Sequence, residues 1–153
     1  MADLASTSIP SWALPGAQPA PREAGAGIRL SVGSATFSGD DLDGAVAWLG
    51  AAIESARAGE RVQLTATVAD CLRLRGTAIS AGLMDDEIDI TPAGYGAITV
   101  QCVHCRRATT TQTAVEQVID CAGCGRSLVV YYHVSRRTGF FMGYQADAEV
   151  PAG

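Results

Sequence analysis

Four of the five cysteines fall in two identical pairs, "CVHC" and "CAGC". The pairs are Cys102 with Cys105 and Cys121 with Cys124, and 15 residues separate them. Two CxxC pairs separated by about 15 to 20 residues are typical of a zinc site. Two residues between thiolates allow a tight turn to direct both sulfurs at one ion, so two such turns complete a tetrahedron. The spacing therefore predicts one metal centre, and we expect it to hold zinc.

Two other interpretations of the cysteines have to be compared with zinc. A redox CxxC pair opens a helix, whose N-terminus lowers the pKa of the thiol, and neither pair here precedes a helical pattern. A rubredoxin-type iron site stays open as the alternative, because iron also accepts four thiolates in this geometry. Four cysteine ligands leave no open coordination position, so a zinc ion here would be structural rather than catalytic.

The segments around the cysteines read as strands that enter and leave two turns: "AITVQC", "RATTTQ", "VEQVIDC" and "SLVVYYHVS". This order predicts an all-β zinc ribbon. Gly123 and Gly125 suit the second turn, where positive φ is expected, whereas the first turn has Arg106 in the matching place. Arg106, Arg107 and Arg126 lie within a few residues of the ligands and offset the negative charge of a metal–thiolate centre.

The section before the cysteines has the pattern of a small α/β module. Strand, helix, strand, helix and strand follow one another, which is typical of a parallel sheet. We expect these elements at residues 27–37, 40–59, 61–68, 69–83 and 86–93. The predicted fold class is therefore α/β, with a small parallel βαβαβ module followed by an all-β zinc ribbon.

The charge balance indicates where the domains divide. Residues 1–95 carry 12 acidic residues and 6 Arg, whereas residues 96–153 carry 4 acidic residues and 5 Arg. We therefore expect an α/β module over 27–95 and the ribbon with its aromatic tail over 96–153. Residues 1–26 are rich in Pro, Ala and Gly and predict an extended N-terminal arm, either disordered or docked on a partner.

The tail after the cysteines gathers 5 of the chain's 9 aromatic residues between Tyr131 and Tyr144. Aromatic residues, Met and Arg are enriched in protein interfaces. The tail therefore predicts a partner interface, and the alternative is a core strand with a second hairpin. The predicted interface residues are Arg136, Arg137, Phe140, Phe141 and Tyr144.

The remaining reactive side chains predict no active site. Cys71 stands alone on a helical pattern and is expected to be a small buried hydrophobic residue. His104 is expected to face solvent, and His133 to be a core or surface imidazole rather than a ligand. The sequence has no convincing nucleophile–base pair, phosphate-binding loop or carboxylate cluster, so no catalytic or cofactor-binding residue is predicted.

The stretch "CVHC…CAGCGRSLVVYYHVSRRTGFFMGYQADAEVP" resembles the C-terminal part of the DmmA-like subunit of bacterial dimethylamine monooxygenase, a haem-dependent oxidative N-demethylase complex. The shared features are the paired cysteines, "SRR" after an aromatic/His strand, an aromatic–x–Gly and the closing "DAE". The resemblance implies that the cysteines at 102, 105, 121 and 124 bind the metal. It also implies a haem-containing oxygenase subunit and a flavin/iron–sulfur reductase subunit as partners, which would carry the haem, FMN and iron–sulfur cluster. Such a complex removes a methyl group from dimethylamine with NADPH and O₂.

A second resemblance covers "RVQLTATVADCLRLRGTAISAGLMDDEIDI", which is similar to the latter half of the nicotinamide module of ferredoxin-reductase-like proteins. That family has a Cys-Gly-Pro-type turn after the strand, where the backbone approaches the nicotinamide. Here the stretch reads "TATVADC", without Gly-Pro. The resemblance therefore implies a module kept for packing rather than for redox chemistry.

Composition and charge decide between classes of function. The net charge of −5, with 11 Arg and no Lys, argues against a nucleic-acid-binding ribbon, which needs a basic face. No apolar run approaches the ~18 residues of a membrane span, and no secretory signal is visible, so we expect a cytoplasmic protein. The favoured hypothesis is a non-catalytic, zinc-containing subunit that supports assembly of the monooxygenase. The alternative is a stand-alone rubredoxin-like electron carrier.

Overall fold

The chain divides into two compact units in the computed structural model, which describes residues 8–14 and 27–147. The first, which we call the α/β unit, comprises Ser11–Gly96 and Arg136–Gly139. The second, the cysteine unit, comprises Met1–Pro10, Ala97–Ser135 and Phe140–Gly153. Most of the predicted N-terminal arm, at residues 1–7 and 15–26, lies outside the described residues.

The α/β unit is built on a four-stranded sheet in the order β2-β1-β3-β4. The central strand β1 runs antiparallel to both β2 and β3, whereas β3 and β4 are parallel. Alternating residues of β1 and β3 are buried, so one face of the sheet is apolar and the other is solvated. The strands are β1 (Ile28–Val32), β2 (Ala35–Gly39), β3 (Val62–Ala66) and β4 (Ile88–Pro92).

The predicted α/β class is confirmed, but the prediction of a wholly parallel sheet is wrong. The single strand predicted over 27–37 is a hairpin, in which Gly33 and Ser34 connect Val32 to Ala35. Gly33 has φ 57°, which suits the tight two-residue turns of β-hairpins. The first strand of this hairpin pairs between β2 and β3, so the sheet is mixed and only β3 and β4 are adjacent parallel strands.

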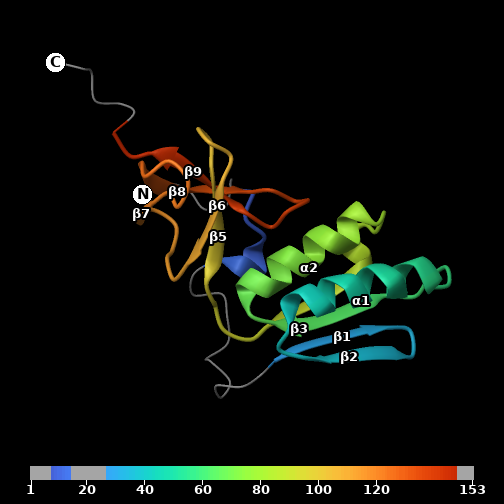
Figure 1. The fold of residues 1–153 in the computed structure, drawn as a ribbon. Helices are drawn as coiled ribbons and strands as arrows, with labels where there is room; N and C mark the ends of the chain where they lie inside the picture. The colour runs from blue at the N-terminus through green and yellow to red at the C-terminus, as the bar shows by residue number, and fades with distance from the viewer. Residues whose placement is uncertain (1–7, 15–26, 148–153) are drawn as a thin grey trace. The chain divides into compact units, whose positions relative to one another are not determined.

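Two α-helices, α1 (Leu42–Ser55) and α2 (Val68–Ser80), cover the apolar face of this sheet (Figure 1). Leu49 of α1 and Leu74 of α2 are fully buried against the strands. A 3₁₀ turn at Asp85–Glu87 leads from α2 into β4. No helix in the described part of the chain is long and apolar enough to cross a membrane.

The described part of the N-terminal arm is packed. A 3₁₀ turn at Ser11–Ala13 buries Ala13 and places Trp12 against the core of the α/β unit. In the cysteine unit, the hydroxyl of Ser8 accepts a hydrogen bond from the N–H of Val134 at 2.9 Å. Residues 8–14 are therefore held by specific contacts.

The short segment Arg136–Gly139 belongs to the α/β unit because it lies against α2. A Cβ atom on Gly76 would stand 2.4 Å from the carbonyl oxygen of Arg137, and one on Gly139 would stand 2.5 Å from the carbonyl of Leu72. Such distances are too short for any side chain. The two glycines thus allow the backbone of the segment to touch the backbone of the helix.

An ion-pair network adds to this contact. Asp85 accepts a hydrogen bond from Nε of Arg75 at 2.7 Å and another from Nη2 of Arg136 at 2.5 Å. The Arg75 guanidinium holds the pKa of the Asp85 carboxyl below its ordinary value, with a smaller contribution from Arg136. Arg75 is 8% exposed, so Asp85 supplies the partner that a nearly buried charge requires.

The cysteine unit is an all-β sheet of five strands in the order β6-β5-β9-β8-β7. β5 and β9 are parallel, and β8 is antiparallel to β9. The C-terminal end of β5 and the N-terminal end of β8 therefore lie at the same end of the sheet. There each strand joins one of the two turns that contain the paired cysteines. The strands are β5 (Ile98–Cys102), β6 (Ala108–Thr111), β7 (Val118–Asp120), β8 (Ser127–Val134) and β9 (Phe141–Gln145).

Strand β9 lies in the middle of this sheet, which corrects one expectation about the tail. Phe141 was predicted to be an exposed interface residue, but its side chain is fully buried. Gly143 pairs with Cys102 of β5, and a Cβ atom there would stand 2.7 Å from Val100 and 3.0 Å from Leu128. The aromatic–x–Gly of β9 is thus explained by packing inside the cysteine unit.

Candidate metal centre

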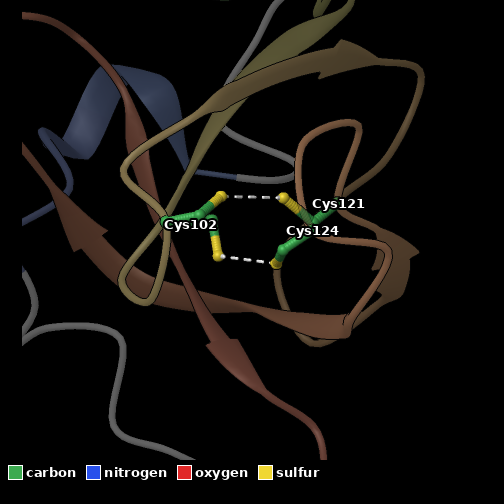
Figure 2. A group of neighbouring side chains, drawn as sticks. Cys102, Cys121 and Cys124 are labelled. Carbon is green, nitrogen blue, oxygen red and sulfur yellow. Dashed lines mark hydrogen bonds between the residues drawn. The ribbon is translucent and has the colours of Figure 1, made fainter.

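The four paired cysteines come together at the tips of two hairpins. Cys102 ends β5 and Cys105 lies in the turn between β5 and β6, whereas Cys121 and Cys124 lie in the turn between β7 and β8. Their Sγ atoms all lie within 4.8 Å of one another. Figure 2 shows the Cys102 side chain facing those of Cys121 and Cys124 from the opposite turn. The structure therefore assembles the four predicted ligands into one cluster.

The sulfur–sulfur distances fit a single tetrahedral ion. The Sγ atoms of Cys102 and Cys124 are 3.8 Å apart, and those of Cys105 and Cys121 are 3.5 Å apart. Zinc–thiolate bonds of about 2.3 Å in a tetrahedron place neighbouring sulfurs about 3.8 Å apart. A disulfide requires about 2.05 Å, so all four residues are free thiols. The group consists of four cysteine sulfurs that face one another, and such a set of thiolates could hold zinc or iron.

The two turns have the same backbone structure. In the first turn, the N–H of Cys102 donates to the carbonyl of Arg107, and the N–H of Arg106 donates to the carbonyl of Cys102, both at 2.9 Å. This arrangement turns the chain so that both sulfurs of a pair point the same way. The second turn repeats the two hydrogen bonds at 2.9 Å, at Cys121, Arg126 and Gly125.

The turns differ in the residue that takes the left-handed backbone conformation. Gly125 has φ 71° in the second turn, and Arg106 has φ 65° in the first. Glycine adopts this conformation freely, whereas a residue with a Cβ atom loses on the order of 1 kcal/mol there. The unusual position of Arg106, recognised from the sequence, is therefore a point of backbone strain beside the metal ligands.

Two thiols 3.5 Å apart have opposite pKa shifts. The N–H groups of Cys124 and Gly123 point at Cys121 and lower the pKa of its thiol to about 6. The N–H of Arg107 also lowers the pKa of Cys105, but burial and the neighbouring thiols outweigh it and raise the value to about 11. The pair therefore favours one thiolate that shares a proton with its neighbour, and a bound cation would displace that proton.

Burial separates the ligands into two inner and two outer groups. Cys102 and Cys121 are buried and pack against Leu128, whereas Cys105 and Cys124 are half-buried. The cluster is thus part of the core of the cysteine unit. A metal bound by all four sulfurs would have no position left for a substrate, which is the arrangement of structural sites.

The other reactive side chains stand apart from this cluster. Cys71 is fully buried in the α/β unit, and burial raises the pKa of its thiol to about 12, so the prediction of a small buried hydrophobic residue is confirmed. His104 is exposed, as predicted. His133 is an exposed residue of β8, and its Nδ1 lies 3.0 Å from the hydroxyl of Ser8.

The start of α2 follows the strand β3, where the backbone of a nicotinamide-type module would approach the nicotinamide. Its N–H groups are already used by the chain itself. The N–H of Val68 donates to the carbonyl of Gly94 at 2.8 Å, the next N–H to the carbonyl of Tyr95 at 3.1 Å, and that of Asp70 to Oγ1 of Thr67 at 3.2 Å. Anion sites at helix N-termini depend on free N–H groups. The first N–H groups of α2 are therefore not free to bind an anion.

The predicted interface residues lie in different environments. Arg136 pairs with Asp85, Phe141 is buried, and Tyr144 is 42% exposed. Sequence reasoning missed two exposed neighbours of Tyr144, although the alternation along β8 could have revealed the first. Tyr131 is 48% exposed, with its ring 5.1 Å from that of Tyr144, and Val118 is 57% exposed. The strand register aligns Val118, Val129 and Tyr144 in one row across three strands.

Two comparisons with known proteins concern this region. Residues 99–144 match the family described as dimethylamine monooxygenase subunit DmmA-like, C-terminal domain. The chain is also 36% identical over 103 residues to the heme-dependent oxidative N-demethylase delta subunit of Ectopseudomonas mendocina (strain ymp). This alignment covers 67% of the present chain and 58% of the relative's length. No solved structure matches the chain significantly.

The family match includes the whole four-cysteine cluster and most of β9. Both comparisons agree with the resemblance recognised in the sequence, which is therefore confirmed: the chain resembles DmmA-like subunits, most specifically in its C-terminal part.

Proposed function

We propose that this DmmA-like subunit is a non-catalytic component of a multicomponent, NADPH- and O₂-dependent dimethylamine monooxygenase in the cytoplasm. It would hold a structural zinc ion and support the assembly of a haem-containing oxygenase subunit with a flavin/iron–sulfur reductase subunit. The observation that carries the proposal is the closed four-thiolate cluster, which lies inside the region that matches the DmmA-like family.

The donor set supports zinc as a structural ion. A structural zinc ion supplies folding free energy and no catalytic chemistry when four thiolates surround it. The chain's own contribution is to hold the sulfurs in place. The buried Cys102 and Cys121 do so from the core side, with Leu128 packed behind them.

A non-catalytic role is supported by what the other candidate groups do. The first two N–H groups of α2 bond to the chain's own carbonyls and are not free to bind a ligand, which agrees with the missing Gly-Pro turn. Cys71 is buried with a raised pKa, which opposes thiolate chemistry at that residue. The haem, FMN and iron–sulfur cluster of such a complex are accordingly assigned to the partner subunits.

The partner interface is proposed on the outer face of β7, β8 and β9. Val118, Tyr131 and Tyr144 expose apolar surface there, and exposed apolar groups that gather on one face mark interaction sites. The predicted interface residues also include Arg136 and Arg137, which are exposed residues of the α/β unit, and Phe140, which is half-buried. Phe141 supports this surface from the core and does not contact a partner directly.

The proposal is tested by reconstitution with the two partner subunits. NADPH-dependent formaldehyde release from dimethylamine should be low for the oxygenase and reductase subunits alone and should rise when the zinc-loaded chain is added. The chain alone should neither oxidise NADPH nor bind haem in spectroscopic titrations. A saturable 1:1 haem complex of the isolated chain, or full activity without the chain, would contradict the proposed role.

A further inference from the structure

The two cysteine turns share a backbone and differ in one residue. Gly125 takes the left-handed conformation in the second turn, and Arg106 takes it in the first, at φ 65°. Glycine would form both turns without strain. The turn itself does not require arginine, yet the first turn has Arg106 in the strained position. Backbone strain of this kind points to a use for the Arg106 side chain.

The hydrogen bonds of Arg106 to other described residues involve only its main chain. Its N–H donates to the carbonyl of Cys102, and its carbonyl accepts from Nε2 of Gln101 at 3.3 Å. A glycine would make both hydrogen bonds equally well. The guanidinium is exposed and forms no ion pair or hydrogen bond with any described residue. Arg75 and Arg136 differ in this respect, since both pair with Asp85.

The surroundings of Arg106 are basic. Residues 102–107 and 121–126 contain 3 Arg and no acidic residue, in a chain whose net charge is −5. The stem of Arg107 lies over Gly123, where a Cβ atom would stand 2.5 Å from Cγ of that arginine. The nearest acid to Arg106 along the chain, Glu116, accepts a hydrogen bond from the hydroxyl of Tyr132, and Asp120, beside the second turn, accepts one from Ser127 at 3.1 Å. The guanidinium of Arg106 therefore lies at a basic end of the cysteine unit and has no acidic side chain paired with it among the described residues.

We propose that Arg106 binds a carboxylate on another protein subunit, and that the first cysteine turn is held rigid to present it. The inference rests on the proposed function, because it names a contact to a subunit of the same complex. A protein carboxylate is favoured over nucleic acid because three arginines on an acidic chain do not form the extended basic face that a phosphate backbone requires. Arginine provides a planar, always charged donor that a carboxylate accepts in pairs.

A competing explanation is that Arg106 only offsets the charge of the metal–thiolate centre. The two explanations differ in what they predict for metal retention when the Arg106 side chain is removed. If Arg106 only offsets charge, Arg106→Gly should weaken metal retention. If Arg106 binds a partner, the same variant should keep its zinc and unfold at a higher temperature, because the strained turn is relieved.

The test uses the full zinc-loaded chain and the purified oxygenase and reductase subunits, with affinities measured at low and high NaCl. Arg106→Gly should bind its partner subunit about 10-fold more weakly than the wild type, the effect of losing a contact of about 1.4 kcal/mol. The salt dependence of binding should fall as well, because one exposed charge pair has been removed. Arg106→Lys should recover part of the affinity, since it restores the charge without the planar pair of donors.

Gly125→Ala is the matched control in the second turn. It adds strain at φ 71° where no atom lies within 4 Å of the new Cβ, so its unfolding temperature should fall while its affinity stays that of the wild type. Wild-type affinity in Arg106→Gly would overturn the inference, as would parallel loss of zinc and binding. Binding of a random duplex oligonucleotide that depends on Arg106, with unchanged subunit binding, would also overturn it. If the wild-type chain binds neither subunit, the proposed function itself has failed.

Discussion

The two units of this chain both bury apolar side chains, but only the cysteine unit adds a cluster of thiols to its core. The α/β unit packs aliphatic side chains of α1 and α2 onto one face of its sheet, with Leu49, Leu64 and Leu74 fully or almost fully buried. The turn end of the cysteine unit buries Cys102, Cys121 and Leu128 as its own small cluster. Aliphatic packing stabilises a fold without any ligand, whereas facing thiols contribute little until an ion joins them. The comparison teaches that only the cysteine unit should depend on metal.

Removing one cysteine ligand should give the largest destabilisation, and that destabilisation should be confined to the cysteine unit. Cys102→Ser is expected to abolish tight zinc binding and to unfold the sheet of the cysteine unit, because structural zinc contributes on the order of 10 kcal/mol to such folds. Hydrogen exchange should show lost protection in β5 to β9 and retained protection in β1 to β4. The measurements are zinc content and site-resolved exchange on the full chain.

Cys71→Ser is the control for that experiment, because it changes the one cysteine outside the cluster. It should keep its zinc and should destabilise the α/β unit instead, since a hydroxyl replaces a fully buried thiol. A Cys102→Ser chain that retains both zinc and its exchange protection would show that the comparison between the units is wrong.

A glycine substitution should give the next largest effect, on the other unit. Gly139 has φ 71°, and a Cβ atom there would stand 2.5 Å from the carbonyl of Leu72. We expect Gly139→Ala to lower the free energy of unfolding of the α/β unit by about 2 kcal/mol or more, because strain and overlap add. Zinc content should not change. Thermal unfolding with a zinc assay on the same samples provides the measurement.

Gly59→Ala separates backbone strain from steric overlap, since Gly59 has φ 90° but no atom lies within 4 Å of the new Cβ. Its cost should be limited to the backbone term of about 1 kcal/mol. Equal destabilisation by the two variants would mean that the 136–139 segment does not rest on α2 as described.

The sequence was sufficient for features that depend on local spacing. The four cysteines, the strands flanking them and the strained position of Arg106 follow from residue types at fixed intervals. The hairpin of β1 and β2 was missed, although the Gly33–Ser34 pair is a recognisable turn. Both kinds of feature are set by neighbours in the chain, so a better reading of the turn would have given the mixed sheet.

Other features could not be predicted because they depend on contacts between distant residues. Phe141 is buried because β9 inserts between β5 and β8, a pairing that no local pattern specifies. Arg136 pairs with Asp85, 51 positions away in the chain, so its exposure to a partner could not be judged from its neighbours. The carbonyls of Gly94 and Tyr95 reach the start of α2 only because β4 returns beside β3.

The smallest expected effect concerns Asp85 and its pH dependence. Asp85→Asn should lower the stability of the α/β unit by about 1 kcal/mol at pH 7, because the nearly buried Arg75 loses its charged partner while solvent screens the exposed side of the pair. The pKa of Asp85 is lowered in the folded chain, so its contribution is complete at neutral pH and is lost as the pH falls through that lowered value. The difference between the two proteins should therefore shrink below about pH 4.

Asp89→Asn is the matched comparison, because Asp89 pairs with the exposed Arg61 at 2.8 Å. It should have a smaller effect than Asp85→Asn, since water replaces the lost partner. Denaturant midpoints of the three proteins from pH 7 to pH 3 provide the measurement. A difference for Asp85→Asn that grows on acidification would contradict the assigned direction of the pKa shift.

The central claim is that the four cysteines hold one structural zinc ion, and the most direct measurement is the metal content and visible spectrum of the full purified chain. About one zinc per chain, no visible absorption and loss of the metal in Cys102→Ser are the predicted results. Stoichiometric iron with the red colour of an oxidised four-thiolate iron site would contradict the claim and would favour the electron-carrier alternative.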